Sequence, residues 1–402
     1  VRVTSPADNL TGFFLYLNPS VSFMDGADLP TPSSNLLFLQ LRSDSQYSTE
    51  INLVNPSNDT KAVVHIELHV GTNVPSFADV ILPPSGAVRF DVGTVFGNDA
   101  LTGDAYLSVG STVPLAGFEL VRGPGDLLGL NAVPTTPGAK TVYIPQMAVL
   151  DPFKMELVVV NTGDEATILT SFLDGWLEIA SSSTEVAATA GYLIPGNNSY
   201  ASVAGSSQGR TRALFSHLAT SSPFFTGVAF LNSGSLAANV RVVAEKPDGT
   251  FLGSYATTLL PGQRISKLVD ELIKPAANQG GGLVWVSSDV PIHMLSLFGS
   301  SVTLALANIP PQPVPSSFVP GGSQNTLQVT PKLAVLQPNA QQARYRSLQR
   351  PRIRPPEPRS ISSRRRQWSE DWVSSAPSLI SPRCRGSTPL NSAFREHPEP
   401  AA

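Results

Sequence analysis

The sequence predicts an all-β protein made of repeated antiparallel β-sandwiches, and three observations lead to this class. Of 402 residues, 31 are Gly and 36 are Pro while only 14% are charged, which is typical of many short strands joined by tight turns. Apolar and polar residues alternate with a period of two, which predicts strands with one buried face. Finally, one pattern recurs, an apolar strand ending in Asn, within 38–55, 144–161 and 215–232.

The first and third of these stretches belong to units that stay in register over most of their length. The matching positions, all 177 residues apart, are Asn55 and Asn232, Pro84 and Pro261, Val113-Pro114 and Val290-Pro291, and Asn131 and Asn308. We therefore expect both units to fold alike. Their length, roughly 90–100 residues, is too long for the blades of a β-propeller, which run to about 45 residues.

The alternation predicts about seven strands in the first full unit. They lie near 36–41, 49–55, 62–70, 77–82, 86–92, 104–109 and 114–121. In the third unit, "KPDGT" at 246–250 predicts a hairpin turn, since Pro restricts φ and Gly permits positive φ. Behind it, apolar residues recur at helical spacing and predict a short helix that plugs the sandwich: Ile265, Leu268, Val269, Leu272 and Ile273.

The middle unit is shorter, and the chain begins partway through a unit. The "LIPG" turn at 193–196 matches "LLPG" at 259–262, so we expect the counterpart of 104–133 to be missing. At the N-terminus, "LTGFFLYL" (10–17) matches "LAGFELV" (115–121), which predicts the second half of a preceding unit. The sequence is therefore expected to be a fragment or mature piece of a longer protein.

These boundaries divide the chain into five predicted segments. They are the end of a preceding repeat (1–34), a repeat (35–134), a shortened repeat (135–213), a further repeat (214–312), and a Pro/Arg-rich linker with a disordered tail (313–402). The first 319 residues hold 14 Lys and Arg against 25 Asp and Glu, whereas the remaining 83 hold 13 against 5. An acidic body thus carries a basic tail.

The basic tail, residues 320–402, has too few apolar residues to bury a core and is predicted to be disordered. Two interpretations stay open. It is an unstructured or artefactual segment, because an Arg/Pro/Ser-rich composition also arises when a GC-rich gene is translated out of frame. Alternatively it is an electrostatic tether to nucleic acid, an anionic surface or the acidic body.

The stretch "VVHIELHV" at 63–70 resembles a zinc site, because His65 and His69 flank Glu67. On a helix, such a spacing places both imidazoles side by side. On the predicted strand, the two residues lie about 13 Å apart at ~3.3 Å per residue, too far to share a metal bound at about 2 Å. We therefore expect a solvated strand face, and no metal.

The other candidate sites are also expected to have structural roles. "GSSQG" at 205–209 fits a nucleophile motif around Ser207, but that motif needs a strand-to-helix turn, whereas the segment before His217 is predicted to be a strand. Calcium at Asp99 and Asp104 remains an alternative for the loops. No catalytic, cofactor-binding or metal-binding residue is predicted.

The aromatic residues Trp176, Trp285, Tyr106 and Phe118 fall within strand patterns. Core packing is the expected role, and an exposed sugar-stacking platform is the alternative. The single cysteine, Cys384, excludes a disulfide in the body, and no apolar run of about 18 residues predicts a membrane span.

The order of strand, Asn, polar turn, strand, L-x-P-G, short helix, V-x-S-x-x-P and strand resembles Ig-like β-sandwich repeats of secreted and surface proteins of soil bacteria. The residues that carry it are Val228–Asn232, Leu259–Gly262, Ile265–Ile273 and Leu283–Leu297, and it covers about 1–312. The resemblance implies an immunoglobulin-like sandwich and an extracellular or cell-surface location, and it brings no catalytic residues.

We therefore expect a non-enzymatic structural or adhesion array, a stalk or spacer of an exported bacterial protein in which tandem units give length. The alternative is a carbohydrate- or protein-binding accessory module of a larger secreted enzyme. The expected partners are polysaccharide or other surface proteins, and no nucleic acid is expected for the body. Catalysis by the chain itself is not expected.

Overall fold

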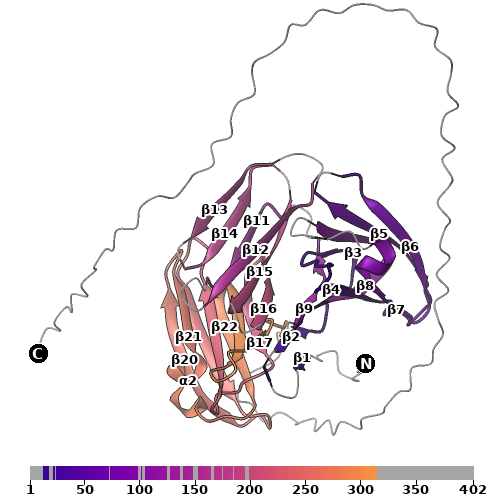
Figure 1. Ribbon diagram of the computed structural model, residues 1–402. Helices are drawn as coiled ribbons and strands as arrows, with labels where there is room; N and C mark the ends of the chain where they lie inside the picture. Colours follow the sequence, from indigo (N-terminus) through magenta and orange to yellow (C-terminus); the bar gives the residue numbers. More distant parts are fainter. Residues whose placement is uncertain are drawn as a thin grey trace, which may run out of the picture. The chain divides into compact units, whose positions relative to one another are not determined.

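The computed structural model describes residues 12–17, 21–22, 24–71, 73–97, 101, 105–124, 127–135, 139–147, 153–163, 167–173, 175–183, 185–194 and 199–314. Over these residues the chain forms antiparallel sheets with two very short α-helices and one turn of 3₁₀-helix (Figure 1). The predicted all-β class is therefore confirmed. The predicted tail, 320–402, lies outside the described residues.

The first full unit consists of two sheets that share one long strand. Its elements are β3 (Ser33–Phe38), β4 (Ser48–Val54), β5 (Ala62–Val70), β6 (Ser76–Leu82), β7 (Ala87–Asp91), α1 (Val92–Phe96), β8 (Ala105–Arg122), β9 (Leu127–Asn131) and β10 (Val133–Pro134). The first half of β8 pairs with β3 and β5, and its second half pairs with β4 and β9. The fully buried side chains of Phe38, Ile51 and Leu107 lie in the core that joins these strands.

The predicted break between the strands 104–109 and 114–121 is wrong, because β8 runs through residues 110–113 without interruption. Pro114 is exposed, and neither half of β8 pairs with another strand at this residue. Since Pro cannot donate a backbone hydrogen bond, the crossing from one sheet to the other is where a strand tolerates it best.

The third unit repeats this arrangement. Its elements are β17 (Arg210–Phe215), β18 (Phe224–Leu231), β19 (Ala238–Glu245), β20 (Phe251–Leu259), β21 (Arg264–Leu268), α2 (Val269–Leu272), a 3₁₀ turn (Lys274–Ala276), β22 (Leu283–Ser300) and β23 (Leu306–Asn308). Like β8, β22 pairs with β17 and β19 in its first half and with β18 and β23 in its second. The bounds of β7 and β21 differ by 177 at both ends.

The helix predicted over 265–273 is only partly correct. Residues Arg264–Leu268 form β21, and the helix is limited to Val269–Leu272. Ile265 lies opposite Phe230 of β18 in an antiparallel ladder. The backbone hydrogen bonds of the sheet therefore determine the conformation of a segment whose apolar spacing alone indicates a helix.

The repeated Asn after β4 and β18 holds the turn that follows each strand. Asn55 and Asn232 are fully buried. The amide of Asn232 donates to Leu236 O at 2.7 Å and to Leu259 O at 2.9 Å, and its Oδ1 accepts from Gly234 N at 3.0 Å. Asn55 bonds in the same way to Thr60 O, Pro83 O and Ser57 N. Each Asn satisfies backbone groups that the turn would otherwise leave unpaired.

The middle unit consists of two three-stranded sheets. Its strands are β11 (Thr141–Ile144), β12 (Lys154–Asn161), β13 (Leu169–Leu173), β14 (Leu177–Ser181), β15 (Val186–Ile194) and β16 (Ser199–Ala204). β14 lies between β11 and β13, as the first half of β8 lies between β3 and β5. β15 lies between β12 and β16, as the second half of β8 lies between β4 and β9.

The prediction that the middle unit lacks the counterpart of 104–133 is therefore wrong. β14 and β15 together correspond to β8. Among the described residues, the unit lacks counterparts of β6, β7 and the helix. The error came from matching "LIPG" to "LLPG", because a Pro-Gly turn can follow any strand and does not identify which one.

The N-terminal segment forms a hairpin of β1 (Phe13–Leu17) and β2 (Met24–Asp28). It packs against the third unit: Met24 is fully buried in that core, and the Phe13 ring stacks on His217 with centroids 6.0 Å apart. The amide of Gln312 also donates to Gly12 O. The first and last described segments of the chain are thus in direct contact, which a linear row of units would not allow.

Four strands near the ends of the N-terminal hairpin and of the three units meet at one place, and we call β2, β9, β16 and β23 the closing strands. β2 contacts β9, β16 and β23, and β16 contacts β9 and β23. Figure 1 shows β2, β9 and β16 close together. Asp25 in β2 joins three of the closing strands, because its fully buried carboxylate accepts from Gly129 N at 2.9 Å and from Asn308 N at 3.3 Å. Burial raises the pKa of Asp25 well above its ordinary value.

No helix among the described residues is both long enough and apolar enough to cross a membrane.

Candidate ligand-binding cavity

A cavity of about 420 Å³ lies where the closing strands meet, and we call it the junction cavity. This volume falls within the usual range for small-molecule sites. Three of its polar residues occupy the same position in their units: Asp28, Asn131 and Asn308 are the last residues of β2, β9 and β23.

Asn308 has an unusual environment for a buried amide. Its side chain is 5% exposed, and no described residue forms a hydrogen bond with the amide group. Its Oδ1 is buried without a partner, as is Oδ1 of Asn131 on the same cavity wall. A buried polar atom without a partner costs about 1–3 kcal/mol. Buried polar atoms without a hydrogen-bond partner call for an explanation, and a role in binding a ligand is one such explanation.

Asp28 and Asn131 form a pair on one side of the cavity. The amide of Asn131 donates to the carboxylate of Asp28 and, at 3.0 Å, to its backbone oxygen. Burial raises the pKa of Asp28 to about 6, although the positive charge of Arg210 opposes the shift. Arg210 also lines the cavity and is exposed. One acidic and one basic side chain therefore face the same space.

His293, on β22, also lines the cavity and is 3% exposed. Its Nδ1 lies 2.6 Å from Ser206 Oγ, and its Nε2 lies 3.1 Å from Ser233 Oγ. Burial lowers the pKa of His293 to about 4, so the imidazole is neutral at pH 7. With both nitrogens bonded to hydroxyls, no carboxylate orients the ring, and a base this weak would activate Ser206 poorly.

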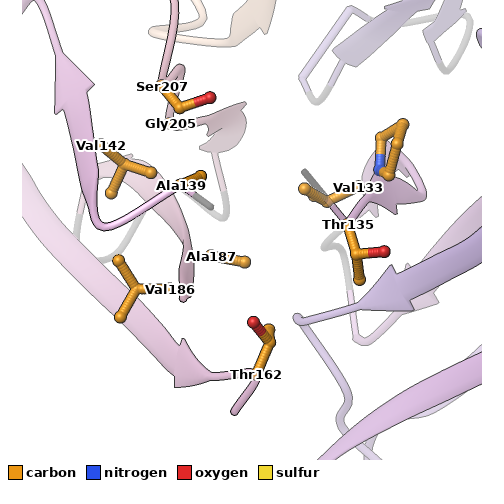
Figure 2. A pocket seen from close by; sticks show the side chains of 10 residues that line it. Val133, Thr135, Ala139, Val142, Thr162, Val186, Ala187, Gly205 and Ser207 are labelled. Carbon is orange, nitrogen blue, oxygen red and sulfur yellow. The ribbon is translucent and has the colours of Figure 1, made fainter. Parts of the chain in front are cut away.

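Ser207, the predicted nucleophile candidate, lies in the wall between the junction cavity and a much smaller pocket of about 30 Å³. Figure 2 shows this small pocket between Val142 and Val186 on one side and Val133 and Thr135 on the other. Its volume suffices for about one water. After Ser207 the chain enters strand β17, so the strand-to-helix turn that a nucleophile elbow needs is absent.

The histidines of "VVHIELHV" lie on the solvated face of β5, where alternation placed them. Val64, Ile66 and Leu68 are buried, whereas His65 makes exposed contacts: its Nδ1 lies 2.7 Å from Asp79 Oδ1 and its Nε2 lies 3.1 Å from Glu67 Oε1. Hydrogen bonding to Asp79 raises the pKa of His65. Within the described part of the chain, no group of three or more His, Cys, Asp or Glu could hold a metal ion.

The aromatic candidates separate into buried and surface positions. Trp176 and Trp285 are 6% and 8% exposed, and Trp285 Nε1 donates to Glu245 Oε2 at 3.0 Å. Neither indole is an exposed platform for a sugar. Tyr106 stacks on His69 at 4.4 Å, and Phe118 meets Phe14 edge to face at 5.1 Å. The calcium candidates Asp99 and Asp104 lie outside the described residues.

Sequence reasoning did not assign a binding role to any residue of the junction cavity. It did contain a signal, because Asn131 and Asn308 were two of the positions that recur at 177 residues. We took both as marks of the repeat. Asp28 gave no such signal, since it lies in the N-terminal hairpin and is a carboxylic acid where the two other strands end in an amide.

No family model matches the chain, and no curated protein matches it. One solved structure, the Anabaena sensory rhodopsin transducer, aligns at 20% identity over 22% of this chain and 95% of that protein, with a TM-score of 0.20. Another, the N-terminal CBM22 tandem of Paenibacillus barcinonensis Xyn10C, aligns at 10% identity over 72% of this chain and 91% of that structure, with a TM-score of 0.15. Scores this low carry no argument about function.

Proposed function

We propose that the chain is a non-enzymatic binding module of an exported bacterial protein, built from immunoglobulin-like β-sandwich repeats that enclose the junction cavity. Its partner is a polysaccharide or a protein of the cell surface. The observation that carries the proposal is the cavity itself, which is ligand-sized and has partnerless amide oxygens on its wall. The weakly basic His293 supports binding over catalysis.

The packing of the N-terminal hairpin favours a binding module over a stalk. A stalk gains length when each unit contacts only its neighbours in sequence. Here Met24 completes the core of the third unit, and Gln312 bonds to Gly12. This contact brings the units together instead of extending them in a row, and it creates the cavity. The arrangement is therefore better suited to enclosing a ligand than to extending from a surface.

A screen that makes no assumption about ligand class tests this function. Ligand-observed NMR would be run on the full chain with a library of neutral sugars, sugar acids, amino sugars, dipeptides and aromatic acids. The variant Ala204→Trp places an indole at an exposed position of the cavity wall, and Ala237→Trp, in an exposed turn outside the lining, is the matched control.

We expect at least one class of compound to bind the native chain and Ala237→Trp, and to lose binding in Ala204→Trp. If no compound distinguishes the two variants, the junction cavity is not a binding site and the stalk becomes the better proposal.

A further inference from the structure

We infer that the junction cavity binds an uncharged, hydroxyl-rich ligand, a sugar residue, through the side-chain amide of Asn308. This inference rests on the proposed binding function and specifies its ligand. It follows from the charge of the cavity, from its unused hydrogen-bonding groups and from its apolar walls.

The charge of the cavity selects neither an anion nor a cation. Three titratable side chains line it among the described residues: Asp28, Arg210 and His293. Asp28 and Arg210 have opposite charges that attract each other, and His293 is neutral at pH 7. The lining therefore carries little net charge at pH 7, so a charged ligand would be desolvated on entry without meeting a net opposite charge, and that desolvation is costly.

The unused hydrogen-bonding groups match hydroxyls. The amide of Asn308 provides one acceptor and two donors, and the described residues use none of them. A hydroxyl both donates and accepts, so two neighbouring hydroxyls of a ligand can pair with the amide, one accepting from Nδ2 and the other donating to Oδ1. The side chains of Ser207 and Gln208, which also line the cavity, can likewise both donate and accept hydrogen bonds. Each hydroxyl of a polyol can donate and accept in this way, whereas a carboxylate only accepts and an ammonium group only donates.

Part of the cavity wall is apolar and suits the C–H faces of a sugar ring. Five prolines line the cavity, together with aliphatic side chains of β9, β16 and β22: Pro30, Pro134, Pro145, Pro310 and Pro311. Their rings are rigid, so contact with a ligand costs little side-chain entropy. A pocket with apolar walls and a few polar groups that fix orientation is the usual design of a small-molecule site.

The test uses isothermal titration calorimetry on the full chain. The probes are neutral di- to tetrasaccharides of glucose, xylose, mannose and galactose, each compared with the matching sugar acid or amino sugar. The variant is Asn308→Leu, which keeps the approximate volume and removes the amide. We expect at least tenfold weaker binding of the neutral saccharide by Asn308→Leu, and no loss of melting temperature.

The melting temperature separates a binding residue from a structural one. If Asn308 served the fold, the Leu variant would unfold earlier and bind unchanged. Because its side-chain amide has no hydrogen-bond partner among the described residues, removing it should relieve a cost. Asn232→Ala, which removes a fully bonded buried amide from the same unit, is the control that must lower the melting temperature.

The outcomes distinguish this inference from the broader function. A sugar acid, an amino sugar or a peptide could bind more tightly than the neutral saccharide, and Ala204→Trp could abolish that binding. This result would overturn the assignment of a neutral sugar and leave the proposed binding function intact. Unchanged affinity in Asn308→Leu, or no binding of any neutral saccharide, would also overturn it. Titrating a polysaccharide before and after partial hydrolysis identifies the source: binding that rises with the number of chain ends indicates a terminal residue.

Discussion

Replacing Glu119 by Gln should stabilise the protein at pH 8 and leave its stability at pH 5 nearly unchanged. Glu119 lies on β8 opposite Ile51 of β4 and Leu130 of β9, and it is fully buried. Burial raises the pKa of its carboxyl to about 8, against an ordinary value of 4.5. The nearby backbone amides of Gln40 and Leu39 oppose this shift only in part.

The sign and size follow from proton linkage. Between pH 4.5 and 8 the folded protein holds a proton on Glu119 that the unfolded chain releases, so stability is lost as pH rises. With 1.36 kcal/mol per pKa unit, the loss from pH 5 to pH 8 is about 3–4 kcal/mol. Gln resembles the protonated acid in shape and charge and carries no such dependence.

The assay is urea unfolding of the full chain, followed by circular dichroism at pH 5 and pH 8. The variant should match the native chain within about 1 kcal/mol at pH 5 and exceed it by about 3 kcal/mol at pH 8. The control is Glu50→Gln on β4, whose largely buried carboxylate lies 3.3 Å from the exposed guanidinium of Arg122; losing this half-exposed pair should cost about 1 kcal/mol at both pH values. Equal destabilisation of Glu119→Gln at both pH values would show that the carboxylate is ionised in the fold and refute the reasoning.

Two further predictions concern the repeated Asn and the strand histidines. Asn232→Ala leaves two carbonyls and one amide unpaired, so it should lower the free energy of unfolding by about 2–4 kcal/mol; a loss below 1 kcal/mol in thermal unfolding would contradict this role. In an NMR titration, His65 should titrate above its ordinary range and His293 near pH 4. Asp79→Asn should lower the pKa of His65 alone, and zinc should leave its signals unshifted.

The strands could be predicted from the sequence wherever one face of the strand is buried and the other is exposed to solvent. β5 has the predicted bounds, 62–70, because Val64, Ile66 and Leu68 alternate with polar residues. The segment of β8 was predicted as two strands, 104–109 and 114–121, because no local signal shows that one strand continues there from one sheet into another. The helix over 265–273 failed for a related reason, since pairing of β21 with β18 depends on residues far away in sequence.

The candidate site could not be predicted, because it depends on how the units meet. Asp28, Asn131 and Asn308 are about a hundred or more residues apart in sequence, and each ends a strand that would read as an ordinary last strand of a sandwich. The repeat identified two of these positions as equivalent. Only the contact of β2 with β9 and β23 shows that equivalent positions share one space.

The asymmetry of the chain explains why the shared space has an unused amide. If an Asn stood at position 28 as well, no carboxylate would be present to accept the hydrogen bond from the amide of Asn131. In β2 the position is Asp28, and its carboxylate accepts from Asn131, which leaves Asn308 as the amide without a partner among the described residues. The same hairpin supplies Met24 to the core of the third unit. Folding of the N-terminal hairpin therefore completes a hydrophobic core and one wall of the junction cavity in a single step, so the stability of the third unit and the capacity to bind should rise and fall together.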